Sequence, residues 1–150
     1  MPKILILNDS VYGSAFDLGD RITEVLADKG HSITREKAPT DDTLRQSEFD
    51  AVLAITSTTG SGDLPENLTQ FWLQCQETFP VITGKPYGVI ALGDSSYPEF
   101  CGSADKLDTL FQELAGTRVS EPCRIDALET PDPSEPALEW LQEWLALSGL

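Results

Sequence analysis

Runs of branched apolar residues alternate along the chain with segments in which apolar residues recur every three or four positions. The continuous runs predict strands that are buried on both faces of a parallel sheet. They occupy residues 3–8, 51–56 and 87–92. Residues 32–36 predict a further strand of edge character. Part of 118–125 predicts a fifth strand, in which Pro122 indicates an edge position or a bulge.

Four segments predict amphipathic helices, because their apolar residues fall on one helical face. The first starts at Ala15 and ends before Gly30. The second opens at Pro65, and the third is closed by Gly116. Their apolar faces, with that of a C-terminal helix, are Ala15, Leu18, Ile22, Val25 and Leu26; Leu68, Phe71, Trp72 and Cys75; Leu107, Leu110, Phe111 and Leu114; and Ala137, Leu138, Leu141, Trp144 and Leu145. The Asp-, Thr- and Gln-rich stretch before residue 51 is expected to lie on the surface.

Strands that alternate with helices imply right-handed βαβ crossovers and a parallel sheet covered by helices on both faces. Five such units favour an α/β three-layer sandwich with a five-stranded parallel sheet in the order 2-1-3-4-5. The chain of 150 residues is expected to form a single domain. Ligands of such sheets bind beyond the carboxyl ends of the strands, so the loops after the first, third and fourth strands are expected to carry function.

The chain is strongly acidic, with 25 Asp and Glu residues against 10 Lys and Arg residues and a formal net charge of -15. This charge repels nucleic-acid phosphates and anionic lipids, so no nucleic acid and no membrane is expected as a partner. A protein partner is expected to present a basic face. Three Trp and six Phe residues supply more apolar surface than a disordered acidic chain has, and the chain is expected to fold.

The cysteine and histidine content argues against several site chemistries. Three cysteines without a CxxC spacing indicate neither a zinc site nor a disulfide framework. His31 is the only histidine, which argues against a His-based triad or metal cluster. The start of the chain leads directly into a predicted strand, and no run of about eighteen apolar residues occurs, so a cytoplasmic location is expected.

The loop after the first predicted strand, residues 8–15 (NDSVYGSA), combines hydroxyl groups with a glycine immediately before a helix. Free backbone N–H groups and the positive end of the helix dipole favour an anion such as phosphate there. The loop has neither a Walker A nor a GxGxxG motif. No Lys or Arg lies between Lys3 and Arg21, so neutral donors would have to hold the anion. Taken alone, the loop is equally consistent with a turn that only caps the helix.

Two further loops follow the third and fourth predicted strands. Residues 56–65 (TSTTGSGDLP) combine hydroxyl groups with two glycines, which suits close approach to a flat ligand or a flexible connector. Residues 92–102 (LGDSSYPEFCG) place an aromatic ring in a turn rich in acceptors. Tyr97 would either stack on a planar ring system or cover the end of the sheet.

These three loops resemble the FMN loops of flavodoxins and of the flavodoxin modules in diflavin reductases. The motifs Ser-x-Tyr-Gly-Ser-Ala, Thr-Thr-Gly-x-Gly-Asp-Leu-Pro and Leu-Gly-Asp-Ser-Ser-Tyr-x-x-Phe-Cys occur in the family's order and at its spacing. Among free-standing members the chain is most similar to the short MioC-type flavodoxins of bacteria. The resemblance implies a flavodoxin-like fold, FMN as cofactor, and an electron carrier rather than an enzyme. Acidic surroundings disfavour the anionic reduced flavin, so a low reduction potential is expected.

The resemblance also implies a role for each loop. The FMN phosphate would be bound by Ser10, Val11, Tyr12, Gly13, Ser14 and Ala15. The inner face and the N5 edge of the isoalloxazine ring would lie along Ser57, Thr58, Thr59 and Gly60. The outer face and the pyrimidine edge would be lined by Leu92, Gly93, Asp94, Tyr97, Phe100 and Cys101. Tyr97 would stack on the ring, and a turn of the Gly60 peptide toward N5 would favour single-electron transfer.

The implied partners are a flavodoxin/ferredoxin–NADP reductase as electron donor and an acceptor redox enzyme with a basic docking face. A monomer is expected. Two departures from the family pattern bear on affinity and potential: Tyr12 stands where Thr is commoner, and Thr59 replaces an aromatic residue that many relatives place against the flavin.

Two other functions stay open. One is a flavodoxin-like interaction module that has lost FMN or retains it weakly, which Thr59 favours. The other is an enzyme that reduces a small molecule on its own flavin, although nothing outside the three loops indicates a substrate pocket. A phospho-receiver domain is excluded, because the third predicted strand ends in Thr-Ser-Thr-Thr without the required Asp.

Overall fold

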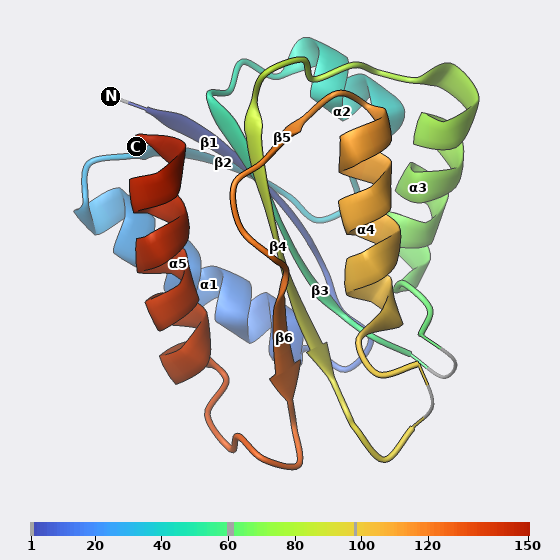
Figure 1. Ribbon diagram of the computed structural model, residues 1–150, viewed down its shortest axis with the longest axis vertical. Coiled ribbons are helices and arrows are strands. Elements are labelled where there is room, and N and C mark those ends of the chain that lie inside the picture. The colour runs from blue at the N-terminus through green and yellow to red at the C-terminus, as the bar shows by residue number, and fades with distance from the viewer. Residues whose placement is uncertain (1, 60–61, 98) are drawn as a thin grey trace.

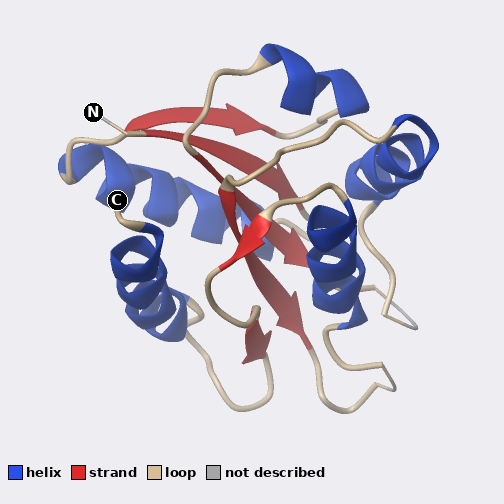
Figure 2. Ribbon diagram, turned by 45° about the horizontal axis from the view of Figure 1, so that its top comes forward, coloured by secondary structure: helices blue, strands red, loops and turns tan. Residues whose placement is uncertain are grey.

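A parallel sheet lies between two layers of helices in the computed structural model, which describes residues 2–59, 62–97 and 99–150 (Figures 1 and 2). The strands are β1 (Lys3–Asp9), β2 (Ser32–Glu36), β3 (Ala51–Ser57), β4 (Pro86–Gly93), β5 (Thr117–Arg118) and β6 (Cys123–Asp126). The helices are α1 (Ser14–Asp28), α2 (Asp41–Gln46), α3 (Glu66–Thr78), α4 (Gly102–Glu113) and α5 (Ser134–Ser148). Within the described ranges, no helix is long and apolar enough to cross a membrane.

The strand order β2-β1-β3-β4-β5 confirms the order expected from the sequence. The fifth position is shared by two short segments, because β5 and β6 both pair with β4. Tyr87 lies opposite Arg118, and Ile90 lies opposite Cys123. Pro122 falls in the gap between the two segments, where the missing N–H of a proline breaks the ladder.

Alternate residues of the central strands enter two separate cores, as the period of a strand requires. Ile4 and Ile6 of β1 pack with α1 and α5, whereas Leu5 and Leu7 pack with α3 and α4 on the opposite face. Figure 2 shows the helices on the two sides of the sheet. Because both faces are covered, the central strands are continuous apolar runs and their carboxyl ends are left free to carry loops.

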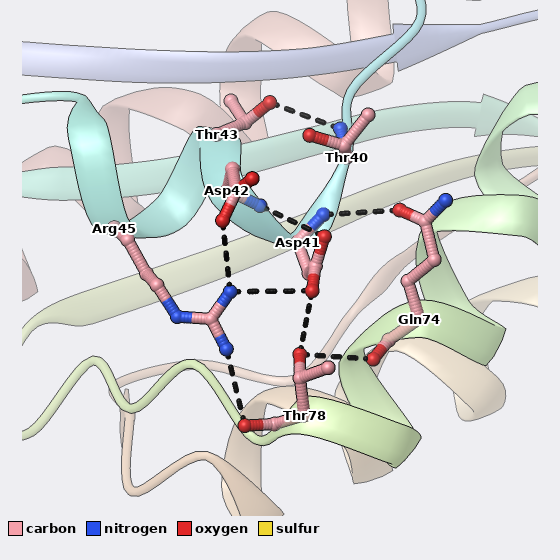
Figure 3. A network of polar contacts seen from close by, with 7 residues as sticks. All are labelled: Thr40, Asp41, Asp42, Thr43, Arg45, Gln74 and Thr78. Carbon is pink, nitrogen blue, oxygen red and sulfur yellow. Dashed lines mark hydrogen bonds and ion pairs between the residues drawn. The ribbon is translucent and has the colours of Figure 1, made fainter.

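Helix α2 is a difference from the sequence expectation, which placed this stretch only on the surface. It has six residues, and only Leu44 among them is buried. A single buried position gives no helical periodicity to detect. Tertiary contacts hold the helix instead: Thr78 Oγ1 donates a hydrogen bond to Asp41 Oδ2 at 2.6 Å, and Arg45 donates to Asp41 at 3.2 Å and to the Thr78 carbonyl at 3.1 Å (Figure 3).

An Asp41→Asn substitution is expected to destabilise the protein at neutral pH and to matter less in acid. Hydrogen bonds from Thr78 and Arg45 lower the pKa of the Asp41 carboxyl below its ordinary value. The ionised carboxylate therefore stabilises the fold above the unfolded-state pKa of about 3.9, and this contribution is lost as the pH falls through the folded-state pKa. Urea unfolding of both proteins at pH 7 and pH 3 measures this difference.

Glu77→Gln is the matched control for that experiment, since it removes one exposed carboxylate from α3. An Asp41→Asn effect on the unfolding free energy that is the same at both pH values would contradict the role given to the ionised carboxylate.

Candidate functional site

A cavity of about 620 Å³ opens at the carboxyl ends of β1, β3, β4 and β6, where the loops gather at the lower end of Figure 1. Its lining comes from the last residues of three strands, the first residue of α1 and the four loops after β1, β3, β4 and β6. It comprises Ser10, Val11, Tyr12, Ser14, Ser57, Thr58, Thr59, Leu92, Gly93, Asp94, Tyr97, Glu99, Phe100, Cys101, Ile125, Ala127, Thr130, Pro131 and Pro133. No Lys or Arg lies among these described lining residues. The cavity is therefore formed by neutral and acidic groups.

The loop after β1 is organised by the Ser10 side chain. Ser10 Oγ accepts hydrogen bonds from the N–H groups of Gly13 at 2.9 Å and Ala15 at 3.2 Å. Gly13 takes a left-handed backbone with φ 98°, which a residue with a side chain rarely adopts. Within the described ranges, the backbone N–H groups of Tyr12 and Ser14 have no hydrogen-bond acceptor. Two free donors thus remain where α1 begins, and both belong to residues that line the cavity.

Two buried polar residues at the end of β1 hold this loop in place. Asn8 Nδ2 donates to the carbonyls of Ala15 at 3.0 Å and Ile55 at 2.9 Å. The Asp9 carboxylate accepts from Ser10 N at 2.9 Å and, at the start of α3, from Asn67 N at 2.9 Å. The loop is therefore fixed both to β3 and to α3. The sequence analysis did not identify this supporting role. The signal for it was the pair of polar residues, Asn8 and Asp9, at the end of an apolar strand.

The loop after β3 is closed by a short antiparallel bridge. The N–H groups of Thr59 and Asp63 each donate to the other residue's carbonyl at 2.9 Å. Contacts with α4 hold the same loop from the side: Thr58 Oγ1 lies 2.6 Å from Ser103 Oγ, and Lys106 Nζ lies 3.0 Å from Asp63 Oδ1. Gly60, which the sequence analysis singled out, lies outside the described residues.

The loop after β4 carries the exposed aromatic ring and a carboxylate that is hydrogen-bonded within the loop. Tyr97 is 60% exposed and lines the cavity. Asp94 Oδ1 accepts from the backbone N–H of Ser96 at 2.8 Å and from its hydroxyl at 2.6 Å, so this carboxylate shapes its own turn. Burial raises the pKa of the Cys101 thiol to about 11. Cys101 is therefore a protonated wall residue and not a nucleophile at neutral pH.

A fourth loop, after β6, contributes to the lining and was not expected. Asp126 Oδ1 accepts hydrogen bonds from the N–H groups of Ser95 at 3.2 Å and Leu128 at 3.0 Å, which links this loop to the one after β4. Hydrogen bonding by Ser95 and then Leu128 lowers the pKa of the Asp126 carboxyl. The available signal was topological, because the carboxyl end of the fifth strand position lies beside that of the fourth.

Thirteen of the sixteen residues named from the sequence lie together in the cavity lining. Of the other three, Gly60 lies outside the described residues, and Gly13 and Ala15 are not among the described lining residues. Ala15 is fully buried behind the loop, and Gly13 sets the loop's conformation without lining the cavity as described. The three loops are thus brought to one place.

Comparisons with known proteins agree with this geometry. A family model described as Flavodoxin matches residues 6–140. Flavodoxin YqcA of Escherichia coli is 34% identical over 144 residues, with 96% of this chain and 97% of the relative covered. Protein MioC of Escherichia coli is 31% identical over 147 residues, with 98% and 99% covered. The solved structure of a mutant flavodoxin from Pseudomonas aeruginosa superposes with a TM-score of 0.90 at 36% identity, with 99% of each chain covered.

The resemblance noted in the three loops is confirmed over nearly the full length of the chain. This chain belongs to the flavodoxin family.

Proposed function

We propose that this protein is an electron carrier that binds one FMN in the cavity at the carboxyl ends of the strands. The observation that carries the proposal is the cavity itself, which has free backbone donors at the start of α1 and the exposed Tyr97 ring on another wall. Membership of a family of FMN-binding electron carriers supports the same reading.

The residues present fit FMN in their chemistry. The free N–H groups of Tyr12 and Ser14, with the positive end of the α1 dipole, are suited to a phosphate without any cationic side chain. The half-buried Thr59 and the exposed Tyr97 would face the flat ring system. When bound, FMN would supply the reversible acceptance and release of electrons.

The chain's own residues set the conditions for that chemistry. Asp94 and Glu99 line the cavity, and their negative charges oppose additional negative charge within it. The N–H donors of the loop after β1 are neutral. They would orient the cofactor without adding a positive side-chain charge that offsets the effect of the two carboxylates. Together these groups favour a low reduction potential.

Binding experiments with the apoprotein test this function. FMN is expected to bind one per chain, and riboflavin is expected to bind about ten- to hundredfold more weakly because it makes no charge-assisted hydrogen bonds to the loop. Fluorescence titration with FMN, riboflavin and FAD measures the three affinities. Equal affinity for riboflavin and FMN would overturn the assignment of the phosphate end.

We further propose that the electron donor is a reductase of the flavodoxin/ferredoxin–NADP type and that the acceptor enzyme has a basic docking face. The formal charge of -15 supports this, since it steers a basic partner by long-range attraction. Reduction by such a reductase is expected to slow as salt rises to about 0.15 M, where the Debye length is about 8 Å. A flat salt profile in stopped-flow measurements would instead indicate docking by apolar contact.

An interaction module with little or no FMN is the second candidate, and Thr59 is the observation that favours it. Tyr12 and Tyr97 line the cavity, but the residue at position 59 is a threonine and has no aromatic ring to stack on the flavin. The visible spectrum of the purified protein, before and after addition of FMN, decides between the two functions. A protein that is colourless after incubation with excess FMN and removal of the unbound flavin would support the module.

A further inference from the structure

Arg35 of β2 reaches beneath α1 and ends behind the loop that follows β1. Its side chain is only 16% exposed. The guanidinium donates to Asn8 Oδ1 through Nε at 3.0 Å and through Nη2 at 2.6 Å. Nη2 also donates to the Phe16 carbonyl at 2.8 Å, and Nη1 forms an ion pair with Asp20. An arginine outside every motif thus contacts the first turn and the middle of α1.

Asn8 transmits this contact to the loop. Its Oδ1 accepts from Arg35, while its Nδ2 donates to the carbonyls of Ala15 and Ile55. The orientation of the amide is therefore set from both ends. Ala15 is the neighbour of Ser14, a cavity-lining residue whose N–H is free. Two successive hydrogen bonds thus connect Arg35 with the carbonyl of Ala15, the residue that follows Ser14.

Gly19 shows that the space for this contact is built into α1. A Cβ atom at position 19 would lie 2.0 Å from Asn8 Oδ1 and 2.7 Å from Arg35 Nη2. No larger residue fits there while both side chains keep their positions. A glycine is costly inside a helix, and here it is the residue that lets Asn8 and Arg35 pass beneath α1.

The positive charge of Arg35 lies where it destabilises α1 considered by itself. A cation beside the first turn of a helix opposes the helix dipole, which favours negative groups at that end. The same cation favours an anion bound in front of that end. The described lining of the cavity holds no Lys or Arg. Arg35 therefore supplies, from behind the loop, a positive charge that the lining does not provide.

We propose that Arg35 is a positioning residue for the phosphate end of the cofactor site. Through Asn8 it holds the loop in the conformation that presents the N–H groups of Tyr12 and Ser14, and its charge favours an anion in front of them. This inference rests on the proposed function, and its experiment separates the two.

The test measures the ratio of riboflavin to FMN dissociation constants for the full-length apoprotein. Arg35→Met is expected to lower this ratio about tenfold, equivalent to about 1.4 kcal/mol, by weakening FMN and leaving riboflavin within about twofold. Arg35→Lys keeps the charge but loses the planar fork, so an intermediate ratio is expected. Asp20→Asn removes the carboxylate that partly neutralises Arg35, so a raised ratio is expected.

Arg45→Met is the matched control, because it also removes an ion-paired arginine but in α2, away from the cavity lining. Its ratio is expected to equal that of the parent. An unchanged ratio in Arg35→Met overturns the inference, as does an equal loss of both flavins, which is what a merely structural role produces. Asp20→Asn keeps the inference testable if Arg35→Met fails to fold, since a ratio that does not rise counts against it. A parent protein that binds both flavins equally would instead overturn the phosphate assignment.

Discussion

Replacing Thr59 with tyrosine is expected to tighten the binding of oxidised FMN by up to about a hundredfold. An aromatic ring stacked on a nucleobase contributes about 1–3 kcal/mol, and stacking on the flat flavin is expected to be of similar size. Threonine forfeits most of this contact. Because a stacked ring disfavours the electron-rich reduced flavin, the same substitution is expected to lower the reduction potential.

The structure supports room for that ring. Thr59 is half-buried and lines the cavity, and its backbone is held by the bridge to Asp63. Leu64, the next apolar residue along this loop, is buried in the core on the α3 side and is not among the cavity's lining residues as described. A tyrosine at position 59 therefore does not have to displace it.

Titration of both apoproteins with FMN and riboflavin measures the effect. Riboflavin is expected to tighten as much as FMN, since stacking acts on the ring and not on the phosphate. Thr59→Val is the control of similar volume without a ring, and its affinities are expected to match those of the parent. Unchanged or weaker FMN binding in Thr59→Tyr would mean that the inner face is not open.

Gly19→Ala is expected to destabilise the protein by about 2 kcal/mol, the middle of the range for overpacking a core. In an ordinary helix interior the same change stabilises by about 0.5–1 kcal/mol, so the expected sign is reversed. The reason is the new Cβ atom, which would lie 2.0 Å from Asn8 Oδ1. Urea unfolding at neutral pH measures the change.

A double-mutant cycle with Asn8→Ala identifies the contact that causes the loss. Asn8→Ala removes the two asparagine atoms nearest to the new methyl group and leaves Arg35 Nη2, the end of a flexible side chain, at 2.7 Å. The double variant is therefore expected to lose less unfolding free energy than the two single variants lose in sum. Purely additive losses, or a Gly19→Ala protein as stable as the parent, would contradict the close contact.

Much of the fold was predictable because its signals are local. The apolar run 3–8 anticipated β1 (Lys3–Asp9) to within one residue, since the middle of a strand buried on both faces is a continuous apolar run. Pro122 anticipated the break in the fifth strand position for an equally local reason, its missing N–H. Helix α2 was not predictable, because its stability comes from Arg45, Asp41 and their contacts with Thr78 on another helix.

The cavity divides in the same way. The loops after β1, β3 and β4 could be named from the sequence because each has its own run of hydroxyls, glycines or aromatic residues. The loop after β6 could not, because Ile125, Ala127 and three residues that follow have no such pattern and line the cavity only through the pairing of β6 with β4.

By itself the sequence determined every helix and strand except α2, the sheet order, the three motif loops and the family, because each of these depends on periodicity or on short runs of residues. Only the tertiary structure decided what stands behind those loops. Asn8 and Arg35 are 27 residues apart in the chain, and Gly19 lies between them in sequence. Their contact exists because parallel pairing brings β2 beside β1 and α1 crosses both strands, and no local pattern records such a meeting.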